Sequence, residues 1–286
     1  MDEATETVCI ASVTNPRDFF TRFYGTDWGS RKTAFEETKK DFAHFSNATL
    51  NSAKGGSRIV LLQEYGICVR KEDEQEFISR AKELAQRTQL YLVIAIGLFP
   101  MNYPDQPWQN KLIWIDPVGK VLAEYFKSKP APPLEPIIAG DGKIPILETI
   151  HGRIASAICA DLDYPGLIRQ AGSGDADILL IPAQDWEAVD PLHSHMAVFR
   201  AIENGVSVIK STGDGLSIAV TPYGLLTDAS GYPDSSQKQM VSCVPNKGIA
   251  TVYSKIGDAF AWLCISGLVI IAFLGCFNKR FTLLGK

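Results

Sequence analysis

The chain has 286 residues, of which 46% are hydrophobic and 21% are charged, and its formal net charge at pH 7 is -4. This composition is that of a globular protein with one large domain or two small ones. The negative charge argues against a protein that follows a nucleic-acid backbone, because such proteins are usually basic. The six cysteines show neither zinc-like spacing nor a disulfide framework, so we expect most of them to be buried free thiols.

Strand-like and helix-like segments alternate in the first part of the chain. The hydrophobic pattern predicts strands at Val8–Val13, Arg58–Gln63 and Tyr91–Phe99, and helices at Thr33–Phe45 and from Asp73 onward. This alternation favours an α/β fold.

A hairpin follows. Lys111–Ile115 and Val121–Tyr125 flank the turn sequence Asp116-Pro-Val-Gly119. Hairpin-like pairs of this kind imply mixed sheets. Four prolines at positions 130, 132, 133 and 136 then predict a stiff, irregular loop.

The second part of the chain continues the alternation. One helix is expected between Asp190-Pro191 and Gly205, with its cap, first-turn proline and terminal glycine in preferred places. Strands are expected at Arg153–Ile158, Ile178–Ile181, Ser207–Ile209 and Leu216–Val220.

The run Ala259–Phe277 contains no charged residue and is close to the length of a membrane-crossing helix. We therefore expect a transmembrane helix at about 259–277 with a short basic tail, and a single-pass membrane protein anchored by it. The alternative is a buried core helix. Residues 1–250 would form the catalytic domain and residues 251–286 the membrane part. The side of the membrane on which the catalytic domain lies stays open.

Three residues could carry chemistry, and each stands where an apolar run gives way to a turn: Glu64, Lys127 and Cys159. A thiol can attack an amide or ester carbon if a nearby group takes its proton. A buried carboxylate can be that base, and an ammonium can stabilise the oxyanion. Taken singly, the cysteine could be inert, the glutamate a turn cap and the lysine a surface residue, so the prediction rests on their conjunction.

Further residues are expected around these three. We assign supporting or oxyanion roles to Glu135, Ala160 and Asp161, and the backbone N–H of Ala160 is the oxyanion donor. Tyr65 is expected to line the substrate site. Trp186 either lines it, as the resemblance described below implies, or is a core residue. The remaining candidates are His193 and His195, which stand two apart and cannot chelate one ion from a helix, so we interpret them as polar helix residues.

These segments resemble the carbon–nitrogen hydrolase (nitrilase superfamily) family over roughly Val8–Val244. The family's Glu–Lys–Cys order is matched by Glu64, by Lys127 after Tyr125-Phe126, and by C-A-D-L-D-Y-P from Cys159 to Pro165. The resemblance implies an α-β-β-α sandwich of two mixed sheets flanked by helices. It implies a thioester mechanism that needs no cofactor and no metal.

Within this family, the chain is most similar to the apolipoprotein N-acyltransferase branch. The spacing of Lys127, Pro132 and Glu135 matches that branch, and the final apolar helix takes the position of its last helix. The resemblance implies acyl transfer from a membrane lipid to an amine. Hydrolysis of a small amide, a non-catalytic binding domain and a homodimer remain open alternatives.

Overall fold

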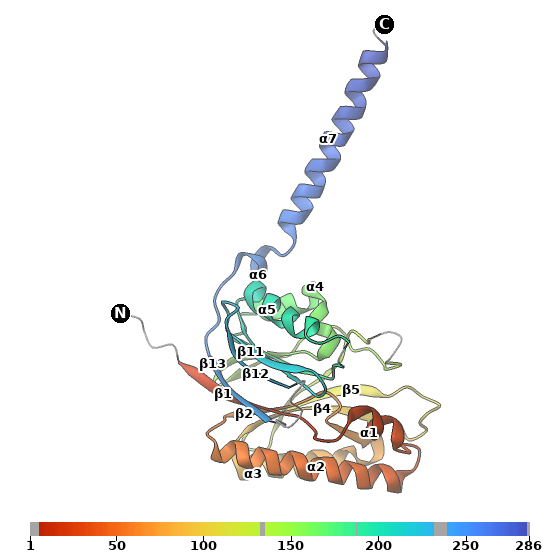
Figure 1. Cartoon of the computed structure of the whole chain (residues 1–286), viewed down its shortest axis with the longest axis vertical. Coiled ribbons are helices and arrows are strands. Elements are labelled where there is room, and N and C mark those ends of the chain that lie inside the picture. The colour runs from red at the N-terminus through yellow and green to blue at the C-terminus, as the bar shows by residue number, and fades with distance from the viewer. Residues whose placement is uncertain (1–5, 132–134, 187, 232–238, 285–286) are drawn as a thin grey trace.

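Two mixed β-sheets form the centre of the molecule in the computed structural model, which describes residues 6–131, 135–186, 188–231 and 239–284 (Figure 1). The seven-stranded sheet contains β1 (Thr7–Val13), β2 (Ile59–Leu62), β3 (Ile67–Arg70), β4 (Tyr91–Phe99), β5 (Gln109–Ile115), β6 (Val121–Phe126) and β13 (Gln239–Pro245). Its order is β13-β1-β2-β4-β5-β6, and β3 also pairs with β4. The six-stranded sheet contains β7 (Ile146–Thr149), β8 (Gly152–Ser156), β9 (Ile178–Ala183), β10 (Ser207–Thr212), β11 (Leu216–Val220) and β12 (Leu226–Gly231), in the order β12-β11-β10-β9-β8-β7.

Each sheet has a parallel centre and antiparallel margins. In the seven-stranded sheet β1, β2 and β4 run parallel, whereas β13 and β5 join them antiparallel. In the six-stranded sheet β8, β9 and β10 run parallel, whereas β7 and β11 join antiparallel. Because the carboxyl ends of parallel strands emerge at one edge, the turns after β2 and β9 are the natural place for a site.

Helices cover the outer faces of both sheets (Figure 1). The seven-stranded sheet is covered by α2 (Arg31–Lys54) and α3 (Glu74–Thr88), and the six-stranded sheet by α4 (Pro165–Ser173) and α5 (Leu192–Asn204). The shorter helices are α1 (Phe19–Gly25), α6 (Val252–Ile256) and the 3₁₀ turns η1 (Lys71–Asp73) and η2 (Cys159–Asp163). The predicted α/β class, with two mixed sheets between helical layers, fits this architecture.

The strand β2 shows why the layers stack in this way. Ile59 and Leu61 pack in the core between the two sheets, whereas Val60 and Leu62 pack against α2 and α3. Successive side chains of a strand point to opposite faces, so a strand covered on both sides must be apolar throughout. The chain that leaves β2 therefore emerges from a rigid, fully buried element.

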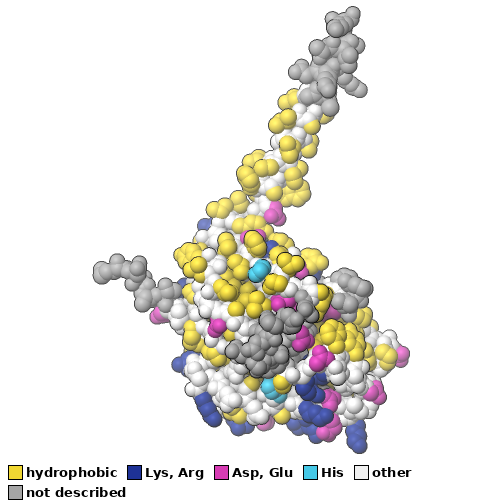
Figure 2. Space-filling model, viewed as in Figure 1, with side chains coloured by type: hydrophobic (Ala, Val, Ile, Leu, Met, Phe, Trp, Pro, Cys, Tyr) yellow, Lys and Arg dark blue, Asp and Glu magenta, His cyan; other side chains and the backbone are white. Residues whose placement is uncertain are grey.

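The last helix, α7 (Ala259–Leu284), extends away from the sheets (Figure 1). Figure 2 shows mainly hydrophobic side chains along its described part, and Lys and Arg side chains gathered at the opposite end of the molecule.

The transmembrane helix expected at about 259–277, and with it the single-pass membrane location, are contradicted. Among the described residues, no helix combines the length and the apolar character needed to cross a membrane.

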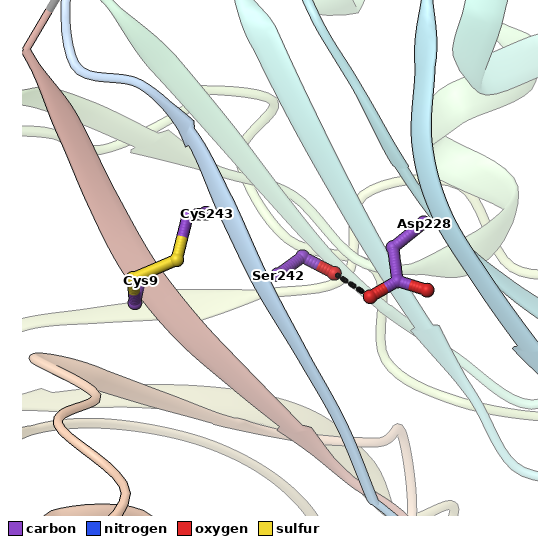
Figure 3. The surroundings of a disulfide bond; sticks show 4 residues. All are labelled: Cys9, Asp228, Ser242 and Cys243. Atoms are coloured by element: carbon purple, nitrogen blue, oxygen red, sulfur yellow. Dashed lines mark hydrogen bonds between the residues drawn. A yellow bond between two sulfur atoms is a disulfide. The ribbon is translucent and has the colours of Figure 1, made fainter.

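Cys9 and Cys243 form a disulfide between β1 and β13 (Figure 3). They stand directly opposite each other in the antiparallel pair. Beside them, Ser242 Oγ donates a hydrogen bond of 3.2 Å to Asp228 Oδ2, which joins the two sheets. The expectation of free thiols fails for this pair, because the cysteines are 234 residues apart and only the strand register brings them together. Three free thiols are described, at Cys68, Cys159 and Cys264.

Replacing both Cys9 and Cys243 with serine should lower the free energy of unfolding by about 2–4 kcal/mol, because the cross-link restricts the unfolded chain. Urea denaturation without reductant measures the change. Cys264→Ser is the matched control, since this exposed thiol has no cross-link to lose. A double variant as stable as the parent protein would contradict the disulfide's contribution.

Candidate active site

Glu64, in the turn that follows β2, is held by donors from three separate segments. Its Oε1 accepts hydrogen bonds from Lys127 Nζ at 2.8 Å and from Asn110 Nδ2 at 2.6 Å. Its Oε2 accepts the backbone N–H of Gln184 at 2.9 Å. The thiol of Cys159 lies beside this carboxylate and lowers its pKa. The glutamate is therefore fixed in one orientation, facing the sulfur.

The charges around Glu64 set its proton affinity. Burial raises the pKa of its carboxyl group, the charge of Lys127 lowers it, and the charge of Glu135 raises it again, so that the net shift is upward from 4.5. A carboxylate with a raised pKa holds a proton more firmly than usual, which suits a general base.

Lys127 lies between two carboxylates, with its side chain 1% exposed. Its Nζ is 2.8 Å from Glu64 Oε1 and 2.6 Å from Glu135 Oε2. Burial alone would lower the pKa of this lysine, but its electrostatic interactions with Cys159, Glu64 and Glu135 outweigh burial and raise it. The group therefore remains an ammonium.

Glu135 returns to the site from the proline-containing loop. Its Oε2 accepts a hydrogen bond from the backbone N–H of Ala131 at 2.8 Å as well as from Lys127. Its Oε1 accepts the hydroxyl of Tyr65 at 2.6 Å. Tyr65, expected to line the substrate site, does line the cavity described below and also orients this second carboxylate.

Cys159 begins η2, just beyond the end of β8. Its φ of 46° lies in the left-handed region, which is uncommon for a residue other than glycine and marks a tight turn. Burial raises the pKa of the thiol well above 9.0, and the charge of Glu64 raises it further, although Lys127 opposes this. The sulfur therefore rests as a thiol beside a carboxylate that can accept its proton.

Asp161 ties the Cys159 turn to the segment that follows Lys127. Its carboxylate accepts backbone N–H groups from Ile158 at 3.0 Å, Ser128 at 3.1 Å and Lys129 at 2.8 Å. Tyr125 donates its hydroxyl to the same carboxylate at 2.8 Å. Asp161 thus acts as a buried support rather than as an oxyanion donor. Ala160, between it and the cysteine, is half-buried.

A cavity of about 80 Å³ opens at Glu64, Lys127 and Cys159. Trp186 lines it, as the sequence suggested, and is 37% exposed. Most of the remaining wall is aromatic. It comes from α1, from the turn after β2 and from the residue before β5: Phe19, Phe20, Phe23, Tyr24, Tyr65 and Trp108. The sequence did not predict α1, because its seven residues are too few to show a periodic pattern.

The sequence also missed a buried group beside the cysteine. Donor atoms of Cys159, Asp185 and His193 all lie within 4.8 Å of one another. Asp185 already carries an ion pair with Lys210 and a hydrogen bond with His193. A cation placed there would meet the ammonium of Lys210, so the arrangement suits proton handling better than metal binding. His193 and His195 both lie in α5, as the sequence predicted, but His193 is buried whereas His195 is exposed.

An α-β-β-α fold with Glu, Lys and Cys side chains meeting at the edges of its sheets defines a protein of the nitrilase class. The family model named Carbon-nitrogen hydrolase matches residues 29–231, which is most of the chain, and the chain belongs to this family.

Curated relatives and solved structures agree with this assignment. The chain is 24% identical over 250 residues to an apolipoprotein N-acyltransferase of Geobacter metallireducens, covering 79% of this chain and 47% of that one. It is 28% identical over 149 residues to a formamidase of Bacillus thuringiensis, covering 46% and 44%. The chain thus spans about half the length of the curated relatives it matches. An amidase from Nesterenkonia sp. has the same fold, with a TM-score of 0.67 at 19% identity over 86% of this chain and 93% of that one.

The site makes a prediction about thiol reactivity. Iodoacetamide should alkylate Cys159 at least about tenfold faster than Cys68, because Glu64 can take the proton of Cys159. Burial raises the pKa of Cys68 to about 12. Peptide mass spectrometry over time gives both rates. Alkylation of Cys159 should slow in Glu64→Gln and Lys127→Ala, while the exposed Cys264 labels equally in all variants and serves as the internal standard. Unchanged labelling of Cys159 in Glu64→Gln would argue against a general base.

Proposed function

We propose that this protein is an acyl-transfer enzyme that forms a thioester on Cys159, with Glu64 as general base and Lys127 as oxyanion stabiliser. The observation that carries the proposal is that all three groups line one cavity, where Lys127 donates a hydrogen bond to Glu64. Membership of the Carbon-nitrogen hydrolase family supports an enzyme of this kind.

In the first half-reaction, Glu64 accepts the thiol proton as the sulfur of Cys159 attacks the acyl carbon. The oxyanion that forms is stabilised by the Lys127 ammonium and the backbone N–H of Ala160. Glu64 then gives its proton to the departing amine or alcohol, and a thioester remains. In the second half-reaction, an amine or water attacks the thioester and restores the thiol.

We propose an ester of a lipid as the acyl donor and an amine as the acceptor, which makes the protein similar in activity to lipoprotein N-acyltransferases. Two observations support this choice. The longer curated match is to an apolipoprotein N-acyltransferase. The cavity wall is aromatic, and Phe20 and Tyr24 at its margin are 49% and 63% exposed, so an apolar chain could continue along them.

Hydrolysis of a small amide is the second candidate. Its support is the cavity volume of about 80 Å³, which suits a short acyl group, together with the formamidase and amidase matches.

The two candidates differ in what accumulates on the cysteine. After mixing with phospholipid, intact-mass spectrometry of the protein should show the gain of one fatty acyl group, absent in Cys159→Ala and present in Cys264→Ser. Ammonia release from a short amide, without a lipid adduct, would favour the amidase. If a folded protein gave neither product, the proposal of an acyl-transfer enzyme would fail and a binding domain would remain.

The electrostatics of the site predict a pH dependence. Because the pKa of Glu64 is raised above 4.5, kcat/KM should fall as the pH drops through a value above 4.5, where the base becomes protonated. In Glu135→Gln the repulsion from the second carboxylate disappears, so the pKa of Glu64 falls and the acidic limb moves to lower pH. Rate profiles of the two proteins test this, and a limb that stays in place or moves upward would contradict the proposed coupling.

A further inference from the structure

A pair of buried amide side chains joins the two sheets next to the site. Gln63 follows β2 of the seven-stranded sheet, and Gln184 follows β9 of the six-stranded sheet. Gln63 Nε2 donates a hydrogen bond of 2.7 Å to Gln184 Oε1, and the two residues are 2% and 7% exposed. We refer to this pair as the glutamine bridge. The mechanism proposed above uses neither side chain.

The neighbours of the glutamine bridge fix the orientation of both amides. At one end, the backbone N–H of Asn15, just beyond β1, donates to Gln63 Oε1 at 2.6 Å. At the other end, Gln184 Nε2 donates to Asp214 Oδ2 at 2.6 Å. Because a backbone N–H can only donate and an ionised carboxylate can only accept, each glutamine has a single orientation that satisfies its partners. The result is a directed chain of hydrogen bonds from the end of β1 to the turn after β10.

Gly213, in the turn after β10, lies directly against the glutamine bridge. A Cβ atom at this position would be 2.1 Å from Gln184 Oε1 and 2.4 Å from Gln63 Nε2. Both distances are far shorter than a van der Waals contact, so any side chain at position 213 would force the two amides apart. Glycine therefore leaves the space that the bridge occupies.

The glutamine bridge reaches Glu64 through the backbone of Gln184. The N–H of Gln184 donates to Glu64 Oε2 at 2.9 Å. Glu64 Oε1 is bound instead by Asn110 and Lys127, which lie in β5 and directly after β6 of the seven-stranded sheet. Since Cys159 lies beyond β8 of the six-stranded sheet, Oε2 is the oxygen held by the half of the molecule that carries the thiol.

The position of the base relative to the thiol depends on that hydrogen bond, because Glu64 and Cys159 belong to different sheets. A general base must lie within hydrogen-bond reach of the proton that it takes, and a small misplacement lowers the rate steeply. Gln63 directly precedes Glu64 in the chain, and Gln184 supplies the N–H. The glutamine bridge therefore joins the two turns between which the N–H contact to Oε2 is made.

We propose that the glutamine bridge positions Glu64 against Cys159 by holding the backbone N–H of Gln184 on Oε2. This inference rests on the proposed thioester function, in which Glu64 takes the proton of the thiol. Gln63 is a positioning residue, since it acts on Glu64 through Gln184.

The glutamine bridge has a predictable effect on the pH dependence of acylation. An N–H that donates to a carboxylate favours its ionised form and lowers its pKa. Loss of the bridge frees this N–H, so the pKa of Glu64 rises and the acidic limb moves to higher pH, opposite to the shift expected for Glu135→Gln. None of the surrounding titratable groups is changed in the variants below. Those that interact with Glu64 are Lys127, Glu135, Tyr65 and Cys159, and Asp185 and Asp214 adjoin Gln184.

Two variants break the glutamine bridge in different ways. Gln63→Met keeps the approximate shape of the side chain without its hydrogen bonds, and Gly213→Ala leaves both amides in place but removes their space. With p-nitrophenyl butyrate as acyl donor, the burst of p-nitrophenolate reports acylation. In each variant the burst rate at neutral pH should fall by about 10- to 100-fold, as expected for a misplaced base. The acidic limb should move to higher pH in both, and no further in the double variant, because both changes break the same contact.

Gly166→Ala is the matched control, because a Cβ at this position meets no atom within 4 Å and should change neither the burst rate nor the limb. Thermal unfolding sets a temperature at which each variant is folded. A normal burst rate or an unmoved limb in folded Gln63→Met or Gly213→Ala would overturn the role of the bridge alone. A parent protein whose burst equals that of Cys159→Ala would overturn the thioester function, and this inference with it.

Discussion

The ammonium of Lys127 is the charge around which the site is organised. It is buried between Glu64 and Glu135, and each of these carboxylates is held in turn by other donors: Asn110 and the Gln184 backbone for the first, Tyr65 and the Ala131 backbone for the second. Removing one partner from a buried ion pair leaves an uncompensated charge, at a cost of about 3–5 kcal/mol. The positions of the base, the proline-containing loop and the cavity wall therefore depend on this single cation, and a neutral residue there would leave two carboxylates facing each other.

The two sheets make different contributions, which explains why the site lies at their common edge. The seven-stranded sheet delivers Glu64 from β2, and Lys127 at the end of β6. The six-stranded sheet delivers Cys159 beyond β8 and the Gln184-Asp185 turn beyond β9. Asp161 connects these contributions, because its carboxylate binds the backbone on both sides of the gap, at Ile158 and at Ser128-Lys129. The buried carboxylate of Asp161 thus fixes the position of Cys159, from one sheet, relative to Lys127, from the other.

Much of this arrangement could be predicted from the sequence, and the failures have physical causes. Strands such as Tyr91–Phe99 were placed correctly because a fully buried strand is a continuous apolar run bounded by turns. Glu64, Lys127 and Cys159, which the sequence singled out because each follows such a run, line one cavity in the structure. In contrast, β3, β7, α1 and α6 are short elements that local patterns do not resolve. The Cys9–Cys243 pair depends on strand register, and the Asp185–His193–Lys210 cluster depends on tertiary packing, so neither has a local signal. The C-terminal apolar run was wrongly interpreted as a transmembrane helix, because the interpretation rested on the uncharged composition of the run, whereas no helix among the described residues is long and apolar enough to cross a membrane.

The disulfide between β1 and β13 also has a mechanical consequence. These strands pair in antiparallel fashion, and the chain leaves β13 toward α6 and α7. Tension applied through α7 would peel β13 from β1 starting at Pro245, and only the pairs Thr7–Pro245 and Val8–Val244 lie ahead of the cross-link. The covalent bond would then carry the load to Cys9 and spare the rest of the sheet. The disulfide thereby links β13, the edge strand that leads to the long helix, covalently to β1. A force applied at the C-terminal helix is therefore transmitted to the first strand of the fold.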